Sequence, residues 1–261
     1  MPRERLDSLL AERGAYPSRT AAAAAVRAGE VRLGADGPFA LRPSQLVDPG
    51  TDLIVASKAR YVSRGGEKLR NALDALPVRV DGRDCLDVGA STGGFTDCLL
   101  QAGAARVAAV DVGHGELDWS LRNDPRVTAI EGLNARSLTR DDLPFAPSLA
   151  TIDVSFISLA KVLPAVVATL DATGDLLAMV KPQFELGPER VGKNGVVREP
   201  EARRDALRSV AAAAESLGLA VRGFASSGLP GPKGNRETFV WCSREGVPLP
   251  DIEAALHEVE P

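Results

Sequence analysis

The sequence predicts an α/β protein in which a mostly parallel sheet carries helices on both faces, preceded by a small α+β unit. From residue 66 onward, short apolar runs alternate with amphipathic stretches, and such helices supply the long crossovers that parallel strands need. One apolar run, residues 85–88, passes directly into a glycine-rich turn and a helix. Residues 1–58 lack this alternation, so a separate unit is expected there.

Two helices and two short strands are predicted in the N-terminal unit. Leucines at helical spacing predict a helix over residues 6–14. A second helix begins after Ser18, a favourable N-cap residue, and runs through an alanine-rich stretch to Gly29. Alternating apolar residues predict strands at 31–33 and 53–55, separated by turns rich in Gly, Pro and Asp.

Seven strands and five helices are predicted in the rest of the chain. The strands are 85–88, 106–111, 127–131, 149–154, 175–181, 219–225 and 238–243. The helices are 66–75, 95–102, 116–122, 158–170 and 200–217. Only a Pro/Gly-rich loop joins the last two strands, so they are expected to form an antiparallel terminal hairpin. The predicted organisation is a domain at 1–58, a linker at 59–65 and a larger domain at 66–261.

Composition excludes several classes of protein. The three cysteines, Cys85, Cys98 and Cys242, are widely spaced and there are only two histidines, which argues against a disulfide framework or a metal site. The N-terminus is polar, and no apolar run reaches the roughly 18 residues that a membrane span needs. We therefore expect a cytoplasmic, monomeric protein without metal or membrane, whose cysteines are core residues.

Basic charge is concentrated at the front of the chain. The net charge is −4, but residues 1–79 carry 13 Lys and Arg against 9 Asp and Glu. A basic N-terminal region is suited to binding a polyanion such as RNA. The alternative is that the uneven distribution of charge arises by chance. Candidate contacts to RNA phosphates, which position a strand without reading its sequence, are Arg3, Arg5, Arg19, Arg42, Arg64 and Arg136.

The turn after the first strand of the larger domain indicates a nucleotide cofactor. Asp87 ends that strand, and the glycines that follow allow tight turning before a helix start with free N–H groups. A pyrophosphate would be repelled by this acid, whereas the ammonium of a methionine moiety would be attracted. Asp111 ends the next strand, 24 residues later, where an acid can bind ribose hydroxyls. These features favour S-adenosylmethionine over NAD.

The candidate cofactor contacts follow from this placement. They are the turn residues and the acids and neighbours at the strand ends: Asp87, Gly89, Ala90, Ser91, Gly93, Gly94, Phe95, Asp111, Val112 and Asp153.

Residues at the strand ends limit which methylation reactions are compatible with the sequence. Methylation at carbon 5 of cytosine needs a cysteine nucleophile on a loop, and all three cysteines fall in or beside predicted strands and helices. Amino-group methylation of bases usually shows a Pro-Pro motif after the fourth strand, and residues 153–156 contain no proline. Lys181 instead ends an apolar strand, at the edge where open α/β sheets bind ligands.

Three more charged residues are expected beside Lys181. Asp153 ends the neighbouring strand, Glu237 precedes the last strand, and Lys68 lies on the helix before the cofactor strand. Lys68, Asp153, Lys181 and Glu237 match the Lys-Asp-Lys-Glu tetrad of the FtsJ/RrmJ-type ribose 2′-O-methyltransferases. The whole chain resembles the TlyA (hemolysin A) family, in segments 63–69, 87–96, 120–126, 155–159, 181–185 and 229–232.

This resemblance implies an S4-like RNA-binding domain followed by a class I methyltransferase sheet that binds S-adenosylmethionine. It implies 2′-O-methylation of cytidine in 16S or 23S ribosomal RNA, or in both, within 30S or 50S subunits. Asn134 resembles the family's contact to the cofactor adenine. Phe184 is a candidate to stack on an extruded base, with a core position as the alternative.

The tetrad suggests a mechanism, because a ribose hydroxyl is a poor nucleophile that needs a base. Lys181 is the candidate base, and its reference pKa of about 10.4 must be lowered by desolvation and by the charge of Lys68. Alternatively, Lys181 only orients the hydroxyl and the proton leaves late. Two other functions stay open: methyl transfer to another RNA or a small molecule, and membrane lysis, which the family's historical name suggests.

Overall fold

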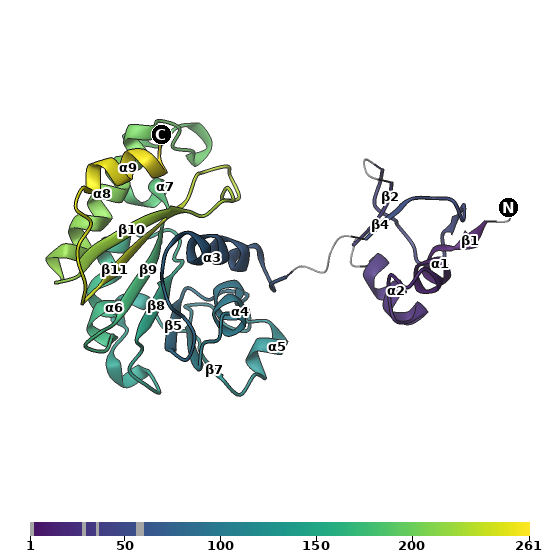
Figure 1. Cartoon of the computed structure of the whole chain (residues 1–261), viewed down its shortest axis with the longest axis horizontal. Coiled ribbons are helices and arrows are strands. Elements are labelled where there is room, and N and C mark those ends of the chain that lie inside the picture. Colours follow the sequence, from purple (N-terminus) through teal and green to yellow (C-terminus); the bar gives the residue numbers. More distant parts are fainter. Residues whose placement is uncertain (1–2, 28–29, 35–36, 56–59) are drawn as a thin grey trace. The chain divides into compact units, whose positions relative to one another are not determined.

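The computed structural model describes residues 3–27, 30–34, 37–55 and 60–261. The chain divides into two compact units, residues 1–60 and 61–261 (Figure 1). The predicted helix end at Gly29 and the predicted boundary at residues 58 and 59 lie outside the described residues.

The N-terminal unit contains both predicted helices, α1 (Leu6–Glu12) and α2 (Arg19–Arg27), and Ser18 Oγ accepts a hydrogen bond from the Ala21 amide at the start of α2. Both predicted strands are present and pair antiparallel as β2 (Val31–Leu33) and β4 (Leu53–Val55). A second pair, β1 (Glu4–Arg5) with β3 (Leu46–Val47), was not predicted, because two residues are too few to show a period.

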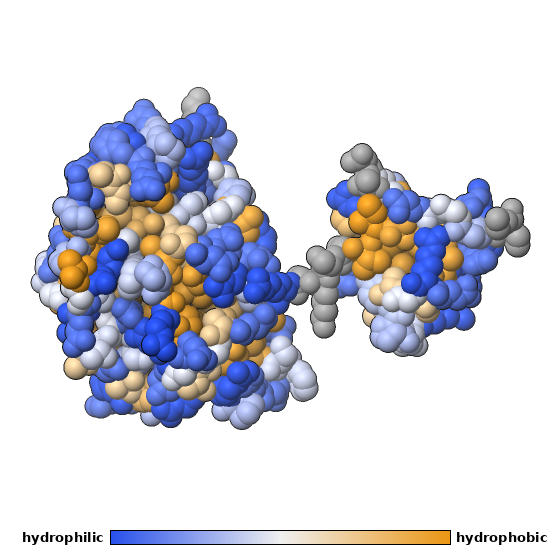
Figure 2. All heavy atoms as spheres, in the orientation of Figure 1, coloured by the Kyte–Doolittle hydropathy of each residue, from blue (hydrophilic) through white to orange (hydrophobic). Residues whose placement is uncertain are grey.

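Apolar side chains from these helices and strands form a small core of their own, which includes the fully buried Leu6, Leu10 and Val31. The unit also leaves apolar surface exposed (Figure 2). Its exposed large hydrophobic residues among those described are Phe39, Leu41, Leu46 and Ile54.

The larger unit is built on a seven-stranded sheet, in the order β10-β11-β9-β8-β5-β6-β7. The strands are β5 (Asp84–Val88), β6 (Arg106–Val110), β7 (Val127–Ile130), β8 (Leu149–Ile152), β9 (Asp175–Val180), β10 (Ala220–Ser226) and β11 (Thr238–Ser243). All seven were predicted. The first five are parallel, whereas β11 is antiparallel to both of its neighbours, β9 and β10. The predicted hairpin is confirmed, with the last strand inserted inside the sheet.

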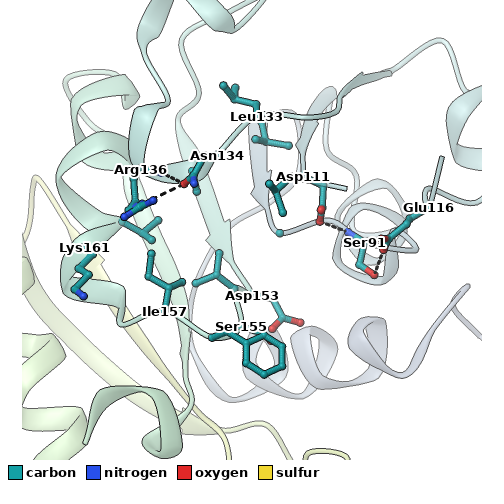
Figure 3. A pocket seen from close by; sticks show the side chains of 17 residues that line it. Ser91, Asp111, Glu116, Leu133, Asn134, Arg136, Asp153, Ser155, Ile157 and Lys161 are labelled. Atoms are coloured by element: carbon teal, nitrogen blue, oxygen red, sulfur yellow. Dashed lines mark hydrogen bonds between the residues drawn. The ribbon is translucent and has the colours of Figure 1, made fainter. Parts of the chain in front are cut away.

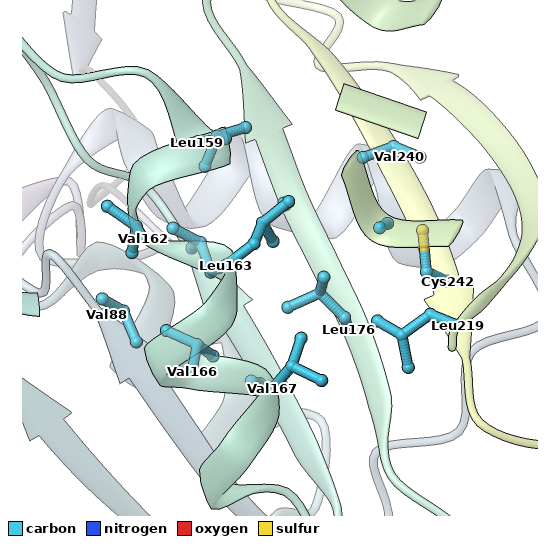
Figure 4. Packing of buried hydrophobic residues seen from close by; sticks show 14 of the residues in the cluster. Val88, Leu159, Val162, Leu163, Val166, Val167, Leu176, Leu219, Val240 and Cys242 are labelled. Atoms are coloured by element: carbon cyan, nitrogen blue, oxygen red, sulfur yellow. The ribbon is translucent and has the colours of Figure 1, made fainter. Parts of the chain in front are cut away.

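Helices cover both faces of this sheet (Figure 1). They are α3 (Arg64–Ala75), α4 (Gly94–Gln101), α5 (Trp119–Arg122), α6 (Leu163–Thr169), α7 (Pro182–Glu185), α8 (Pro200–Ser216) and α9 (Ile252–Val259). One core layer packs α6 and α8 against the sheet and includes Val88, Leu163 and Val240 (Figure 4). On the other face of the sheet, α3 and α4 pack against the strands through a second core layer, which includes Leu69 and Phe95.

Three predicted helices differ from the structure for local reasons, two because of a side-chain cap and one because of a proline. Ser63 accepts from the Gly65 amide and starts α3 two residues early. Asp118 accepts from the Ser120 amide, so α5 begins only after it. The predicted helix 158–170 is split into a 3-10 turn, η3 (Leu159–Lys161), and α6, which has a proline in its first turn.

Helix α9 was missed, although Asp251 offered a start signal: its side chain accepts from the Ala254 amide. The three cysteines are buried, as the sequence suggested, and burial raises the pKa of Cys85 and Cys242 to about 12. Within the described ranges, no helix is long and apolar enough to cross a membrane. The same residues contain no cluster of three His, Cys, Asp or Glu side chains suited to a metal ion.

Candidate active site

Two buried ion pairs stand at the carboxyl edge of the sheet. Lys181 follows β9 and Asp153 follows the parallel neighbour β8, so the two side chains emerge together, with Nζ and Oδ1 2.6 Å apart. Glu237 directly precedes β11, which is antiparallel to β9, so its start lies at this same edge. Glu237 Oε2 lies 2.5 Å from Nζ of Lys68 on α3. The structure therefore brings the four predicted residues to one edge.

Burial makes these pairs unlike surface salt bridges. Lys68 and Lys181 are each 8% exposed, and Glu237 is 2% exposed. A buried charge is tolerated when a counter-charge and hydrogen bonds compensate for its lost hydration. Lys181 has one further partner that the sequence analysis missed: it donates to Ser155 Oγ at 2.8 Å. Ser155 lies two residues after Asp153, and this closeness in sequence to a predicted site residue could have indicated it as a second partner of Lys181.

A cavity of about 700 Å³ is lined by Asp153, the partner of Lys181 (Figure 3). Its walls come from the carboxyl ends of β5, β6, β7 and β8 and the turns that follow them. A smaller cavity of about 140 Å³ lies against the start of α3 and is lined by Ser63, Lys68 and Phe95. The two cavities share Gly89, Ser91 and Asp153.

The shared turn is held by the acid at the end of β6. Asp111 Oδ2 accepts from the Ser91 amide at 2.8 Å, and Oδ1 accepts from the Gly113 amide at 2.7 Å. Ser91 has a left-handed backbone (φ 46°), and its Oγ donates to Glu116 Oε2 at 3.1 Å. Asp111 and Glu116 both line the larger cavity (Figure 3). Glu116 was not predicted.

Two glycines of the turn are required by close packing. Gly89 has a φ of 86°, and a Cβ there would lie 2.5 Å from the carbonyl oxygen of Asp153. A Cβ on Gly94 would lie 2.2 Å from Ser63 Oγ and 2.9 Å from the Gly66 amide. These residues therefore bring the cofactor turn, the Asp153 segment and the start of α3 into contact.

Asp87 lies differently from the other predicted cofactor residues. Its carboxyl is fully buried, accepts from Thr96 Oγ at 2.7 Å and from Thr151 Oγ at 3.4 Å, and lines neither cavity. Burial is the main cause that raises its pKa to about 7, while the Thr96 hydrogen bond acts in the opposite direction. Asp87 thus ties β5 to α4 and β8 beneath the turn.

The remaining predicted cofactor residues divide between the two cavities. Gly89, Ser91, Asp111, Val112, Asn134 and Asp153 line the larger one, and Ala90, Gly94 and Phe95 join the lining of the smaller one. Gly93 caps α4 with a φ of 96° and lines neither. Asn134 Oδ1 also accepts from the Arg136 amide and so caps the 3-10 turn η1 (Ala135–Ser137).

The predicted RNA-binding arginines are exposed on their units. Arg5 and Arg19 both reach Asp7, at 2.8 and 3.3 Å, and the hydrogen bond from Arg5 is the main cause that lowers the pKa of this carboxyl to about 2. Arg64 donates to the Pro230 carbonyl at 2.8 Å. Arg136 lines the larger cavity, and Arg3 and Arg42 are surface residues of the N-terminal unit.

One aromatic residue at the cavity escaped the sequence analysis. Phe156 is 91% exposed, lines the larger cavity and has a left-handed backbone (φ 63°), which costs a bulky residue energy. Its ring lies 5.1 Å from that of the half-buried Phe184, measured between centroids. Exposure and backbone strain together make Phe156 a candidate functional residue.

The parallel sheet with its inserted antiparallel last strand, and the cavity at its carboxyl edge, define an α/β methyltransferase. The family model of FtsJ-like methyltransferases matches residues 61–244, which include both ion pairs. The chain belongs to this family.

Three relatives extend the likeness to the whole chain. The chain is 48% identical over 260 residues to the 16S/23S rRNA (cytidine-2′-O)-methyltransferase TlyA of Mycobacterium tuberculosis, covering 98% of this chain and 96% of that protein. It is 36% identical to Hemolysin A of Brachyspira hyodysenteriae, covering 89% and 97%. A solved structure from Streptococcus thermophilus, described as a candidate hemolysin, is 42% identical with a TM-score of 0.75, covering 99% and 94%. The predicted TlyA resemblance is confirmed.

Proposed function

We propose that this enzyme methylates the ribose 2′-hydroxyl of cytidine in ribosomal RNA. One observation carries the proposal: a buried lysine, Lys181, is held by Asp153 and Ser155, and both of these partners line the larger cavity. The relative named TlyA from Mycobacterium tuberculosis, 48% identical, is described as acting on cytidine in 16S and 23S rRNA. We extend that substrate class to this chain.

The residues around the two cavities fit S-adenosylmethionine. Asp111 and Asn134 would hold its nucleoside in the larger cavity, and the amino-acid portion would lie toward Ser63 and Phe95 in the smaller one. The cofactor carries a sulfonium, and the carboxylates of Asp111, Glu116 and Asp153 give the larger cavity acidic walls to match it. When bound, S-adenosylmethionine supplies an electrophilic methyl group.

Lys181 would act on the hydroxyl that attacks this methyl group. Its ammonium is fixed by Asp153 and Ser155, so its position does not depend on a flexible side chain. As a neutral amine, Lys181 would accept the proton of the ribose hydroxyl as the bond to the methyl group forms. Alternatively, it stays an ammonium that only orients the hydroxyl oxygen, and the proton leaves late to solvent. Holding the two reactants in line supplies much of the rate in such a site. Lys68, paired with Glu237, lies on the smaller cavity and adds positive charge there.

Phe156 would position the target nucleotide. An exposed ring held in a strained conformation at the cavity can stack on a base that has left its helix. The Phe184 ring packs against the Phe156 ring in a tilted arrangement. In this proposal Phe184, which the sequence suggested as a stacking residue, acts through its neighbour.

The N-terminal unit would bind RNA as an S4-like domain. Arg5 and Arg19 converge on Asp7, which fixes two guanidinium groups at one surface. With Arg3 and Arg42 they would contact phosphates and position the subunit without reading sequence. The substrate is then a 30S or 50S subunit rather than a free nucleotide.

The test is to incubate the enzyme with isotopically labelled S-adenosylmethionine and with unmodified 30S and 50S subunits, and to map methylated riboses. Label on a cytidine 2′-oxygen supports the proposal, and absence of ribose methylation on both subunits overturns it. Two relatives carry hemolysin names, so leakage from liposomes is measured with the same preparation. Leakage at low protein concentration without methylation would favour a membrane-active protein.

A further inference from the structure

The larger cavity has two walls of opposite charge. Arg136 on η1 and Lys161 on η3 line it on one side, and Figure 3 shows Ser91, Asp111 and Glu116 on the other. The acidic side suits a cofactor that carries a sulfonium and an ammonium. The carboxylate of the cofactor lies with its amino-acid portion, which we place in the smaller cavity, and that cavity is lined by neither Arg136 nor Lys161. The basic side therefore meets no anionic group of the cofactor, and it repels the cationic ones.

Neither cation on the basic side is neutralised by a carboxylate. The Lys161 ammonium makes no hydrogen bond or ion pair with any residue that the structure describes, and it is exposed at the cavity. Among the described residues, the Arg136 guanidinium reaches only Asn134 Oδ1, an uncharged amide oxygen, at 3.4 Å. Most other cations of this unit that face a cavity or the interior, such as Lys68 and Lys181, have an acid partner.

Both cations nevertheless stand on fixed backbone. Glu185 accepts from Ser158 Oγ at 2.7 Å and from the Leu159 amide at 2.9 Å, which fastens the start of η3 to α7. Helix α7 begins directly after Lys181, so the turn that carries Lys161 is anchored to the segment that carries the proposed base. Asn134 fixes η1 in the same way, by accepting from the Arg136 amide at 3.1 Å.

We propose that Arg136 and Lys161 together bind a phosphate group of the RNA strand beside the target nucleotide. This inference rests on the proposed function and adds Lys161 to its binding residues. A guanidinium and an ammonium both donate charge-assisted hydrogen bonds to phosphate oxygens. Because η3 is tied to the Lys181 segment, the bound phosphate sets the distance from the strand to the reacting hydroxyl. The contact positions the strand and reads no base.

The experiment compares full-length Lys161→Gln, Arg136→Gln and the double variant with the unaltered enzyme. RNA affinity is measured at several salt concentrations on the unmodified ribosomal subunit that the enzyme methylates, together with kcat and KM. We expect each single variant to raise KM for RNA about three- to tenfold and to reduce the slope of log K against log salt by about 1. Affinity for S-adenosylmethionine, measured by calorimetry, stays unchanged.

Two further variants sharpen the test. Lys161→Arg keeps the charge and should retain most of the affinity for RNA. Arg222→Gln removes a cation from β10, where it stacks on Trp241 away from the cavity, and should leave both RNA affinity and the salt slope unaltered.

Failure of this inference differs from failure of the proposed function. If the enzyme methylates RNA and Lys161→Gln matches it in affinity and salt slope, Lys161 contacts no phosphate. If Lys161→Gln instead weakens binding of S-adenosylmethionine, the basic wall belongs to the cofactor site and the inference is wrong. If the unaltered enzyme binds and methylates no RNA, the proposed function and this inference fail together.

Discussion

The Lys68 ammonium and the Glu237 carboxylate lie 2.5 Å apart in the interior, although 169 positions separate them in the chain. The pair joins α3, at the front of the larger unit, to the start of β11 near its end. Each charge therefore depends on the other for its burial.

Removing one member of this pair should destabilise the fold. Glu237→Ala leaves the buried Lys68 ammonium uncompensated, and we expect a loss of about 3–5 kcal/mol in the free energy of unfolding. The combined change Lys68→Met with Glu237→Met should recover most of that stability but not activity. Urea unfolding followed by circular dichroism measures both. A Glu237→Ala variant as stable as the unaltered protein would contradict the coupling.

Lys181→Ala should abolish methyl transfer while leaving cofactor binding nearly intact, because Lys181 lines neither cavity and the proposed function places it at the ribose hydroxyl. Loss of a proton-transferring group typically costs about 10²–10⁴-fold in kcat. Single-turnover rates and calorimetry with S-adenosylmethionine separate the two effects. Ser155→Ala, which removes only one partner of Lys181, should cost less. Weakened cofactor binding in Lys181→Ala would mean that its role is wrongly assigned.

Phe156→Ala and Phe156→Gly should separate backbone strain from stacking. Both remove the ring, so both should raise KM for RNA several-fold. Glycine also relieves the left-handed backbone, and Phe156→Gly should be about 1 kcal/mol more stable than Phe156→Ala. Thermal unfolding and steady-state kinetics provide the comparison. Unchanged KM in both variants would rule out stacking on the substrate.

Asp87 predicts a pH dependence of stability. Its pKa is raised from 3.8 to about 7, so between these values the native carboxyl keeps a proton that the unfolded chain has lost. The native state then binds more protons, and this group's contribution to stability falls as pH rises from about 4 to 7, by up to about 4 kcal/mol in total.

Asp87→Asn mimics the protonated carboxyl and should remove this dependence. The variant is expected to be more stable than the unaltered protein at pH 8, with the difference vanishing near pH 4. Urea unfolding at both pH values measures it. Asp74→Asn, at an exposed residue of α3, is the control and should leave the pH dependence in place. A constant difference at the two pH values would contradict the assigned cause.

Much of this fold could be predicted because its signals are periodic. Apolar strands and the glycine turn stand out in a single sequence, and the confirmed resemblance to the TlyA family rests on segments of such motifs. The place of β11 between β9 and β10 could not be predicted, because pairing of distant strands leaves no local pattern.

The candidate site likewise has residues that the sequence could predict and residues that it could not. Residue types at strand ends pointed to Lys181 and Asp153, since the topology of a parallel sheet brings such ends together. The strain at Phe156 and the burial of Asp87 were invisible, because each depends on backbone angles and on neighbours far away in the sequence. The catalytic and binding roles of these residues stay predictions.

The insertion of β11 has a consequence for synthesis of the chain. Strands β9 and β10 each form hydrogen bonds with β11 and not with each other. A chain synthesised only as far as residue 237 therefore lacks the strand that joins them, and β9 and β10 each have an unpaired edge. The sheet closes only when residues 238–243 have been added. Glu237, which directly precedes β11, can settle against Lys68 only then, so the buried ion pair forms together with the closure of the sheet.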